Sequence, residues 1–148
     1  MEHPQPFWKR KALDDMTRSE WESLCDRCGR CCLHKLEIPE TGKVIYTSVA
    51  CRFLDLETCL CCRYADRKRR APGCLILKPE TVPLYRWLPK SCAYRRLSEG
   101  RGLEWWHHLI SGDFDTVHEA GISVRDKAIS EKSINKKCLE AYAMECDI

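Results

Sequence analysis

The sequence predicts an α+β fold, a small and loop-rich single domain. Three observations lead to this class. The 148 residues match the size of one ordinary domain. One stretch alternates in the manner of a β-hairpin, and short helix signals are separated by proline and glycine turns.

A short helix is predicted over residues 17–25, "TRSEWESLC". Its start carries two nested capping boxes, in which a hydroxyl residue precedes a glutamate by three positions. These are Thr17 with Glu20, and Ser19 with Glu22. The helix would deliver Cys25 at its C-terminal end, and Gly29 permits a tight turn soon afterwards.

A β-hairpin is predicted over residues 33–49, "LHKLEIPETGKVIYTSV", with its turn at 39–42. Residues 91–99 predict a second helix, which Gly100 ends. "GISVR", at 121–125, predicts a short strand, and a polar tail follows it.

We expect the chain to have three parts. Residues 1–16 form a loosely ordered N-terminal arm with an aromatic pair, Phe7 and Trp8. Residues 17–112 form a cysteine-rich core. Residues 113–148 form a C-terminal segment, with the short strand and the polar tail, packed on the same domain.

Cysteines are crowded into one part of the chain. Ten of the twelve lie between positions 25 and 92, and "CDRCGRCC" holds four of them in eight residues. The N-terminus lacks an export signal, so we expect a cytoplasmic protein whose thiols stay reduced. Disulfides between such near neighbours would also be strained. A Cys-x-x-Cys turn brings two sulfurs within reach of one ion, so the pattern predicts metal binding that stabilises the fold.

Adjacent Cys31 and Cys32 indicate more than one metal ion. Neighbouring side chains diverge in a strand and point about 100° apart in a helix. Each cysteine would therefore face a different site, or one would bridge two ions. Cys138 and Cys146 stand alone in the polar tail, where burial as small apolar residues is the favoured interpretation.

Thiolate ligands suit zinc, iron–sulfur clusters and Cu(I). The Cys-x2-Cys-x2-Cys spacing also begins the common ferredoxin run, but here Cys32 follows at once and no proline comes after it. Zinc is therefore favoured, and iron stays open. Several cations flank the cysteines and could offset thiolate charge. They are Arg27, Arg30, Lys35, Arg52 and Arg63.

Other chemistry is less strongly indicated. His34 could replace a thiolate, although a water-exposed hairpin residue is favoured. His107 and His108 follow a tryptophan pair, Trp105 and Trp106, which predicts core packing. No catalytic constellation is recognised, and no apolar run reaches the length of a membrane span.

Nucleic acid is a disfavoured partner. The basic run at 63–70 could contact phosphate, but the net charge is only +3 and the pI is 8.2. A solvated helix face is the favoured interpretation of that run. A protein partner is left open.

The motif "CDRCGRCC" resembles the Cys-x-x-Cys-x-x-Cys-Cys signature of the YkgJ-type cysteine-cluster family. "EWESLCDRCGRCCLHKL", "ACRFLDLETCLC", "WLPKSCAYRRLSEG" and "ISVR" are similar to its YcgN-like subgroup of bacterial proteins. The resemblance implies chelation of zinc or iron and no particular reaction. Cys62, Cys138 and Cys146 fall outside the family pattern, and His108 stands where subgroup members tend to have proline. The metal ligands that the resemblance implies are Cys25, Cys28, Cys31, Cys32, Cys51, Cys59, Cys61, Cys74 and Cys92.

The expected function is that of a metal-binding protein that chelates zinc or iron through clustered cysteines, in a structural role or in metal handling. The first alternative is an iron–sulfur or redox accessory protein. A weaker alternative is a zinc-stabilised nucleic-acid-binding module.

Overall fold

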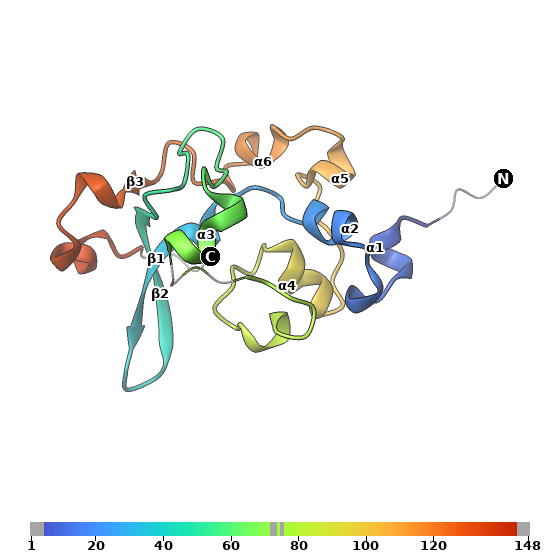
Figure 1. The fold of residues 1–148 in the computed structure, drawn as a ribbon, viewed down its shortest axis with the longest axis horizontal. Coiled ribbons are helices and arrows are strands. Elements are labelled where there is room, and N and C mark those ends of the chain that lie inside the picture. Colours follow the sequence, from blue (N-terminus) through green and yellow to red (C-terminus); the bar gives the residue numbers. More distant parts are fainter. Residues whose placement is uncertain (1–4, 72–73, 75, 145–148) are drawn as a thin grey trace. The chain divides into compact units, whose positions relative to one another are not determined.

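The computed structural model describes residues 5–71, 74 and 76–144, in which short helices accompany one small sheet and long irregular segments (Figure 1). The helices are α1 (Phe7–Arg10), α2 (Arg18–Ser23), α3 (Arg67–Arg70), α4 (Ala93–Ser98), α5 (His108–Ser111) and α6 (Thr116–Glu119). The strands are β1 (Leu33–Ile38), β2 (Lys43–Ala50) and β3 (Ile129–Ser130). The 3-10 turns are η1 (Leu13–Asp15), η2 (Arg30–Cys32), η3 (Tyr64–Asp66), η4 (Val82–Leu84), η5 (Glu131–Ser133) and η6 (Lys136–Tyr142). The predicted α+β, loop-rich class is confirmed.

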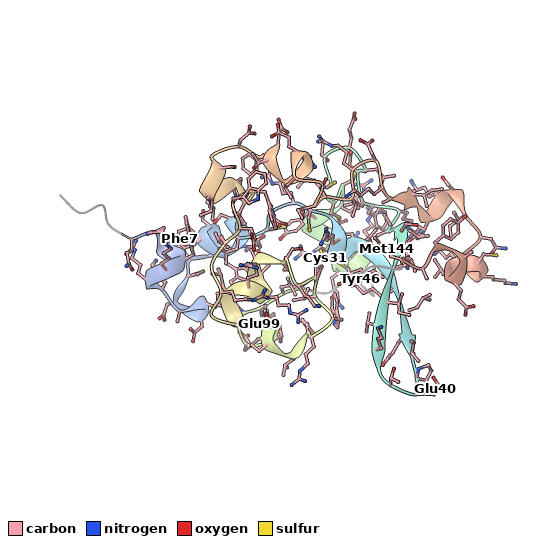
Figure 2. All side chains as sticks on the ribbon, turned by 180° about the vertical axis from the view of Figure 1, so that it is seen from behind. Phe7, Cys31, Glu40, Tyr46, Glu99 and Met144 are labelled. Carbon is pink, nitrogen blue, oxygen red and sulfur yellow. The ribbon has the colours of Figure 1, made fainter. Side chains whose placement is uncertain are left out.

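Strands β1 and β2 form the predicted hairpin. They pair antiparallel, with Leu36 opposite Ile45, and Glu40 lies at the tip (Figure 2). The ladder is irregular between Leu33 and Lys35, near the base of the hairpin. Alternation in the sequence predicted this element, although β2 is buried on both faces at its far end, where Tyr46, Thr47, Val49 and Ala50 are buried.

The strand predicted at residues 121–125 is wrong. Those residues are irregular, and the third strand is β3, which pairs parallel to β2 through Val49 and Ile129. The reason lies in the backbone partners. The Val124 N–H donates to the carbonyl of Cys28 at 2.9 Å, so it takes no part in a sheet ladder.

The chain divides into two compact units within the domain. The first joins residues 1–26 to residues 77–117, and the second joins residues 27–76 to residues 118–148. The core of the first unit is a cluster of buried side chains: Leu24, Val82, Leu88 and Tyr94. Phe7 and Trp8 pack against it, so the described part of the N-terminal arm is folded rather than loosely ordered.

Helix α2 begins at the first of the two nested capping boxes. Thr17 Oγ1 accepts from the Glu20 N–H at 3.1 Å, and Glu20 Oε1 accepts from the Thr17 N–H at 2.9 Å. Its Trp21 ring lies 4.6 Å from the ring of Tyr94, whose hydroxyl donates to the Trp21 carbonyl. The helix ends at Ser23 and so leaves Cys25 just beyond it.

Two further predictions about the first unit have different outcomes. Helix α4 lies within the predicted 91–99 range, and Gly100 follows it with φ +77°, as expected of a residue that ends a helix. Core packing of the tryptophan pair is wrong for Trp105, which is 59% exposed.

No helix among the described residues is long and apolar enough to cross a membrane.

Candidate metal centre

The Cys28–Cys32 turn is shaped by one glycine. Gly29 adopts φ +76°, a left-handed conformation that costs glycine little. The chain then forms η2, and the Arg30 N–H points toward Cys28 Sγ at 3.5 Å. The predicted tight turn at Gly29 is confirmed.

Cys31 and Cys32 do not diverge as the sequence suggested. Their thiols hydrogen-bond to each other. Both residues end the single turn η2, immediately before β1, so the regular angle between neighbours in a helix does not apply to them. Cys31 is exposed and Cys32 is half-buried.

The hairpin register brings a third cysteine to this pair. Leu33 at the start of β1 is opposite Ala50 at the end of β2. The next residues outward are Cys32 and Cys51, and the Cys51 N–H donates to the Cys32 carbonyl at 2.9 Å. A register fixed by burial therefore places cysteines from two segments side by side.

A tight loop after β2 carries the next cysteines. Leu54 and Cys61 form an isolated antiparallel bridge. Between them, Asp55 Oδ1 accepts from the N–H groups of Glu57 and Thr58 and so closes the turn. This local structure folds Cys61 back over the residues that follow Cys51.

Cys74 completes a group that we call the cysteine cluster. Its members come from three segments of the second unit: Cys31, Cys32, Cys51, Cys61 and Cys74. Cys74 lies within electrostatic reach of Cys31, Cys51 and Cys61, while Cys32 lies within reach of Cys31, Cys51 and Cys74. Figure 2 shows Cys31 near the base of the hairpin, in the same region as Tyr46.

Neighbouring thiols and burial make Cys32 and Cys74 harder to ionise. The hydrogen bond with Cys31 raises the pKa of Cys32, and burial and the neighbouring thiols raise it further. Burial raises the pKa of Cys74, an effect that Arg67 opposes. Several thiolates this close require positive charge between or beside them.

Two cations lie beside the cluster. Lys35 is within electrostatic reach of Cys31, Cys32 and Cys74, and its Nζ donates to the Cys31 carbonyl at 2.9 Å. Burial lowers the pKa of Lys35, and these thiols oppose that shift. Arg67 beside Cys74 was not among the predicted flanking cations, because it lies in the basic run that the sequence assigned to solvent.

Cys28 and Cys59 both lie at the Gly29 turn. Both are buried, at 7% and 4% exposure. A Cβ added at Gly29 would lie 3.3 Å from the Cβ of Cys59. The sulfur of Cys59 faces residues 123–125, which sequence reasoning missed as part of the site. The only signal was that "ISVR" is one of the stretches carrying the family resemblance.

The remaining cysteines have varied positions. Cys25 is exposed and Cys92 is half-buried, and both belong to the first unit. Cys62 is exposed. Cys138 is also exposed, so its predicted burial is wrong: it lies in η6, where no described residue is buried. Cys146 lies outside the described residues. None of the described cysteines forms a disulfide.

The His34 side chain is 33% exposed, and one of its ring nitrogens already has a partner. Its Nε2 lies 2.5 Å from Glu131 Oε2, and the Glu131 side chain is buried. His34 is thus a hairpin residue that stays partly exposed and that Glu131 partly covers. The basic run is largely exposed and partly helical, as expected of a solvated helix face.

The donor types fit the metals that the sequence predicted. Clustered thiols of residues 31–74 are soft ligands that suit zinc or iron–sulfur chemistry. Among the described residues, no three Cys, His, Asp or Glu side chains are gathered closely enough to enclose one ion. The assignment of the nine family cysteines as ligands stays a prediction.

Comparison with known proteins places the chain in a family. Residues 24–93 match the CxxCxxCC model described as "Putative zinc- or iron-chelating domain". A UPF0260 protein of Gluconacetobacter diazotrophicus is 61% identical over 86% of this chain and 79% of its own. One of Marinobacter nauticus is 54% identical over 93% of both chains, and one of Allorhizobium ampelinum is 52% identical over 97% and 89%. No solved structure matches. The chain belongs to the UPF0260 family.

Proposed function

We propose that this protein binds zinc or iron through its clustered cysteines and that the metal stabilises the fold or is handled by the protein. The observation that carries the proposal is the cysteine cluster itself. Three segments separated along the chain bring Cys32, Cys51 and Cys74 within electrostatic reach of one another. A small domain gains little from gathering free thiols in one place unless they bind something.

The electrostatics support a cationic occupant. Ionised thiolates at these positions would repel one another. Protonated thiols would avoid the repulsion, but they would gain little from lying together. A divalent ion or an iron–sulfur core relieves the repulsion, because its charge favours the deprotonated form of each ligand. Lys35 and Arg67 would then offset the remaining negative charge.

Zinc is the first choice because the ligands include two adjacent cysteines and the run departs from the ferredoxin spacing after Cys31. The cytoplasm is the compartment that we propose, since it keeps thiols reduced. A protein partner that receives or supplies the metal is compatible with this function.

The test is elemental analysis of the full chain purified without oxygen, with visible absorption to separate zinc from iron–sulfur. We expect bound zinc or iron in the wild type and a marked loss in Cys32→Ser. Cys138→Ser is the matched control, because that exposed thiol lies outside the cluster. Metal-free wild type, or unchanged metal content in Cys32→Ser and Cys74→Ser, would contradict the proposal.

A further inference from the structure

Strand β1 is an edge of the sheet. Among the residues that the structure describes, the strand order is β1-β2-β3, so β1 has a hydrogen-bonded neighbour on one side only. Of its six residues, only Leu33 is buried. An edge strand carries a row of outward N–H and C=O groups that can pair with a strand of another chain. The edge of β1 is therefore a candidate for strand addition.

The outer part of the hairpin has few neighbours. On the other side of β2, the described backbone partners reach Tyr46, whose carbonyl accepts from the Met144 N–H at 2.8 Å. From Ile45 to the turn, the described part of the sheet consists of β1 and β2 alone. Figure 2 shows Glu40 at the far end of the hairpin, away from Cys31 and Tyr46 at its base. A two-stranded hairpin is marginally stable by itself, and a further strand stabilises it.

The middle of β1 is self-complementary in charge. Lys35 and Glu37 are two positions apart, so they lie on the same face of the strand. The Lys35 Nζ stays beside the backbone and donates to the carbonyls of Cys31 and Leu33, at 2.9 and 2.8 Å, while Glu37 is exposed. When two copies of β1 meet antiparallel about a two-fold axis through Leu36, Lys35 of each copy is opposite Glu37 of the other. Opposite charges at such positions stabilise a sheet.

The other face of β1 is self-complementary in apolar side chains. Leu36 is opposite Ile45 of β2, and both are half-buried. The same two-fold axis brings the two copies of Leu36 together, so that one apolar row runs across both hairpins. Pro39, directly after β1, ends the pairing because it has no N–H to donate.

We propose that a second copy of this chain binds along the edge of β1 as an antiparallel strand and joins two three-stranded sheets into one. Both copies use the same surface, so the assembly closes as a dimer. The charges select the register, because a shift of two residues in either direction places Lys35 opposite Lys35 or Glu37 opposite Glu37. This inference goes beyond the proposed function and requires no metal.

Sedimentation equilibrium of the full chain, kept reduced and without oxygen, tests the inference. We expect a monomer–dimer equilibrium at micromolar to millimolar concentrations, because an interface of two short strands is small. Glu37→Lys places lysines opposite each other at two positions and should raise the dissociation constant by about 10-fold or more. Amide hydrogen exchange of residues 34–38 should slow as the wild-type concentration rises, and it should not do so in Glu37→Lys.

The matched control is Glu57→Lys, which makes the same charge change at an exposed glutamate outside the hairpin. It should change the dissociation constant by less than about 2-fold, because a site distant from an interface acts independently of it. Circular dichroism checks that each variant folds.

A wild-type chain that stays monomeric up to millimolar concentration would overturn the inference. A dimer that Glu37→Lys leaves intact, or that both variants weaken equally, would also overturn it, because another surface then forms the dimer. Growth beyond two copies would contradict the two-fold arrangement. These results are independent of the metal content, which tests the proposed function separately.

Discussion

At the residue scale, burial and partners decide what each titratable side chain does. His107 is 2% exposed, and its Nε2 lies 2.7 Å from the Leu24 carbonyl, while its Nδ1 accepts from the Leu109 N–H. One ring nitrogen thus accepts and the other donates, which describes a neutral imidazole. The tryptophan pair before it predicted core packing, and His107 is the residue of that stretch to which the prediction applies best.

The buried state of His107 predicts a pH dependence of stability. Burial lowers the pKa of His107, an effect that the Leu24 hydrogen bond and Asp26 oppose. The unfolded chain therefore binds more protons than the folded chain near and below the ordinary pKa of about 6.5. The contribution of His107 to stability is complete above that pH and is lost as the pH falls through the lowered value.

Chemical unfolding of the wild type and of His107→Gln at several pH values between 5 and 8 measures this effect. The difference in unfolding free energy between the two chains should be largest at pH 8 and should shrink toward pH 5. Taking the difference cancels the pH dependence of metal binding, which both chains share. A difference that stays constant with pH would contradict the neutral, buried assignment.

Gly29 gives a second prediction at the residue scale. Gly29→Ala should destabilise the fold through the left-handed backbone, by about 1–2 kcal/mol. It should cost about 1–3 kcal/mol more because the new methyl group would overlap Val124. Gly42→Ala is the matched control, since Gly42 has φ +70° but no atom within 4 Å of an added Cβ. Equal costs for the two variants would mean that the 28–32 turn does not pack as described.

At the scale of elements, a helix or strand was predicted correctly where its sequence pattern acts within a few residues. The hairpin at 33–49 and helix α4 were predictable because alternation, capping and a terminating glycine act within a few residues. The strand expected at 121–125 failed because Val124 pairs with Cys28, a partner far away in sequence. Local pattern also could not choose between the two nested capping boxes of α2.

The capping box of α2 is therefore tested by paired substitutions. Thr17→Ala should cost about 1 kcal/mol of unfolding free energy, because it removes the acceptor for the Glu20 N–H. Ser19→Ala should be neutral or slightly stabilising, because Ser19 is an exposed position inside the helix and alanine is the better helix former. If Ser19→Ala costs more than Thr17→Ala, the helix begins two residues later than described.

At the scale of the whole molecule, the sequence predicted the fold class. It did not predict which of its many cysteines lie close together in space. Spacing along the chain could not reveal that Cys74 belongs with Cys31 and Cys51, whereas Cys59 faces Ser123. This grouping of the cysteines arises from the register of the hairpin and from long-range contacts of residues 118–125. Short-range spacing identified candidate ligands, and tertiary structure decides which of them share surroundings.

Metal removal gives the prediction for the whole molecule. A chelator under reducing conditions should lower the melting temperature of the full chain markedly, because a ligand that binds only the folded state stabilises it. Structural zinc contributes on the order of 10 kcal/mol in small zinc-binding peptides. Adding Zn²⁺ back should restore the transition. An unchanged melting curve after verified removal of the metal would make the metal dispensable for the fold.

The most direct test of the central claim is X-ray absorption at the metal edge of the full chain, purified without oxygen. It reports which atoms surround the bound metal. The account predicts a first shell dominated by sulfur, at about 2.3 Å if the metal is zinc. This sulfur signal should diminish in Cys32→Ser and stay unchanged in Cys138→Ser. A shell made only of oxygen and nitrogen would show that the clustered cysteines are not the ligands.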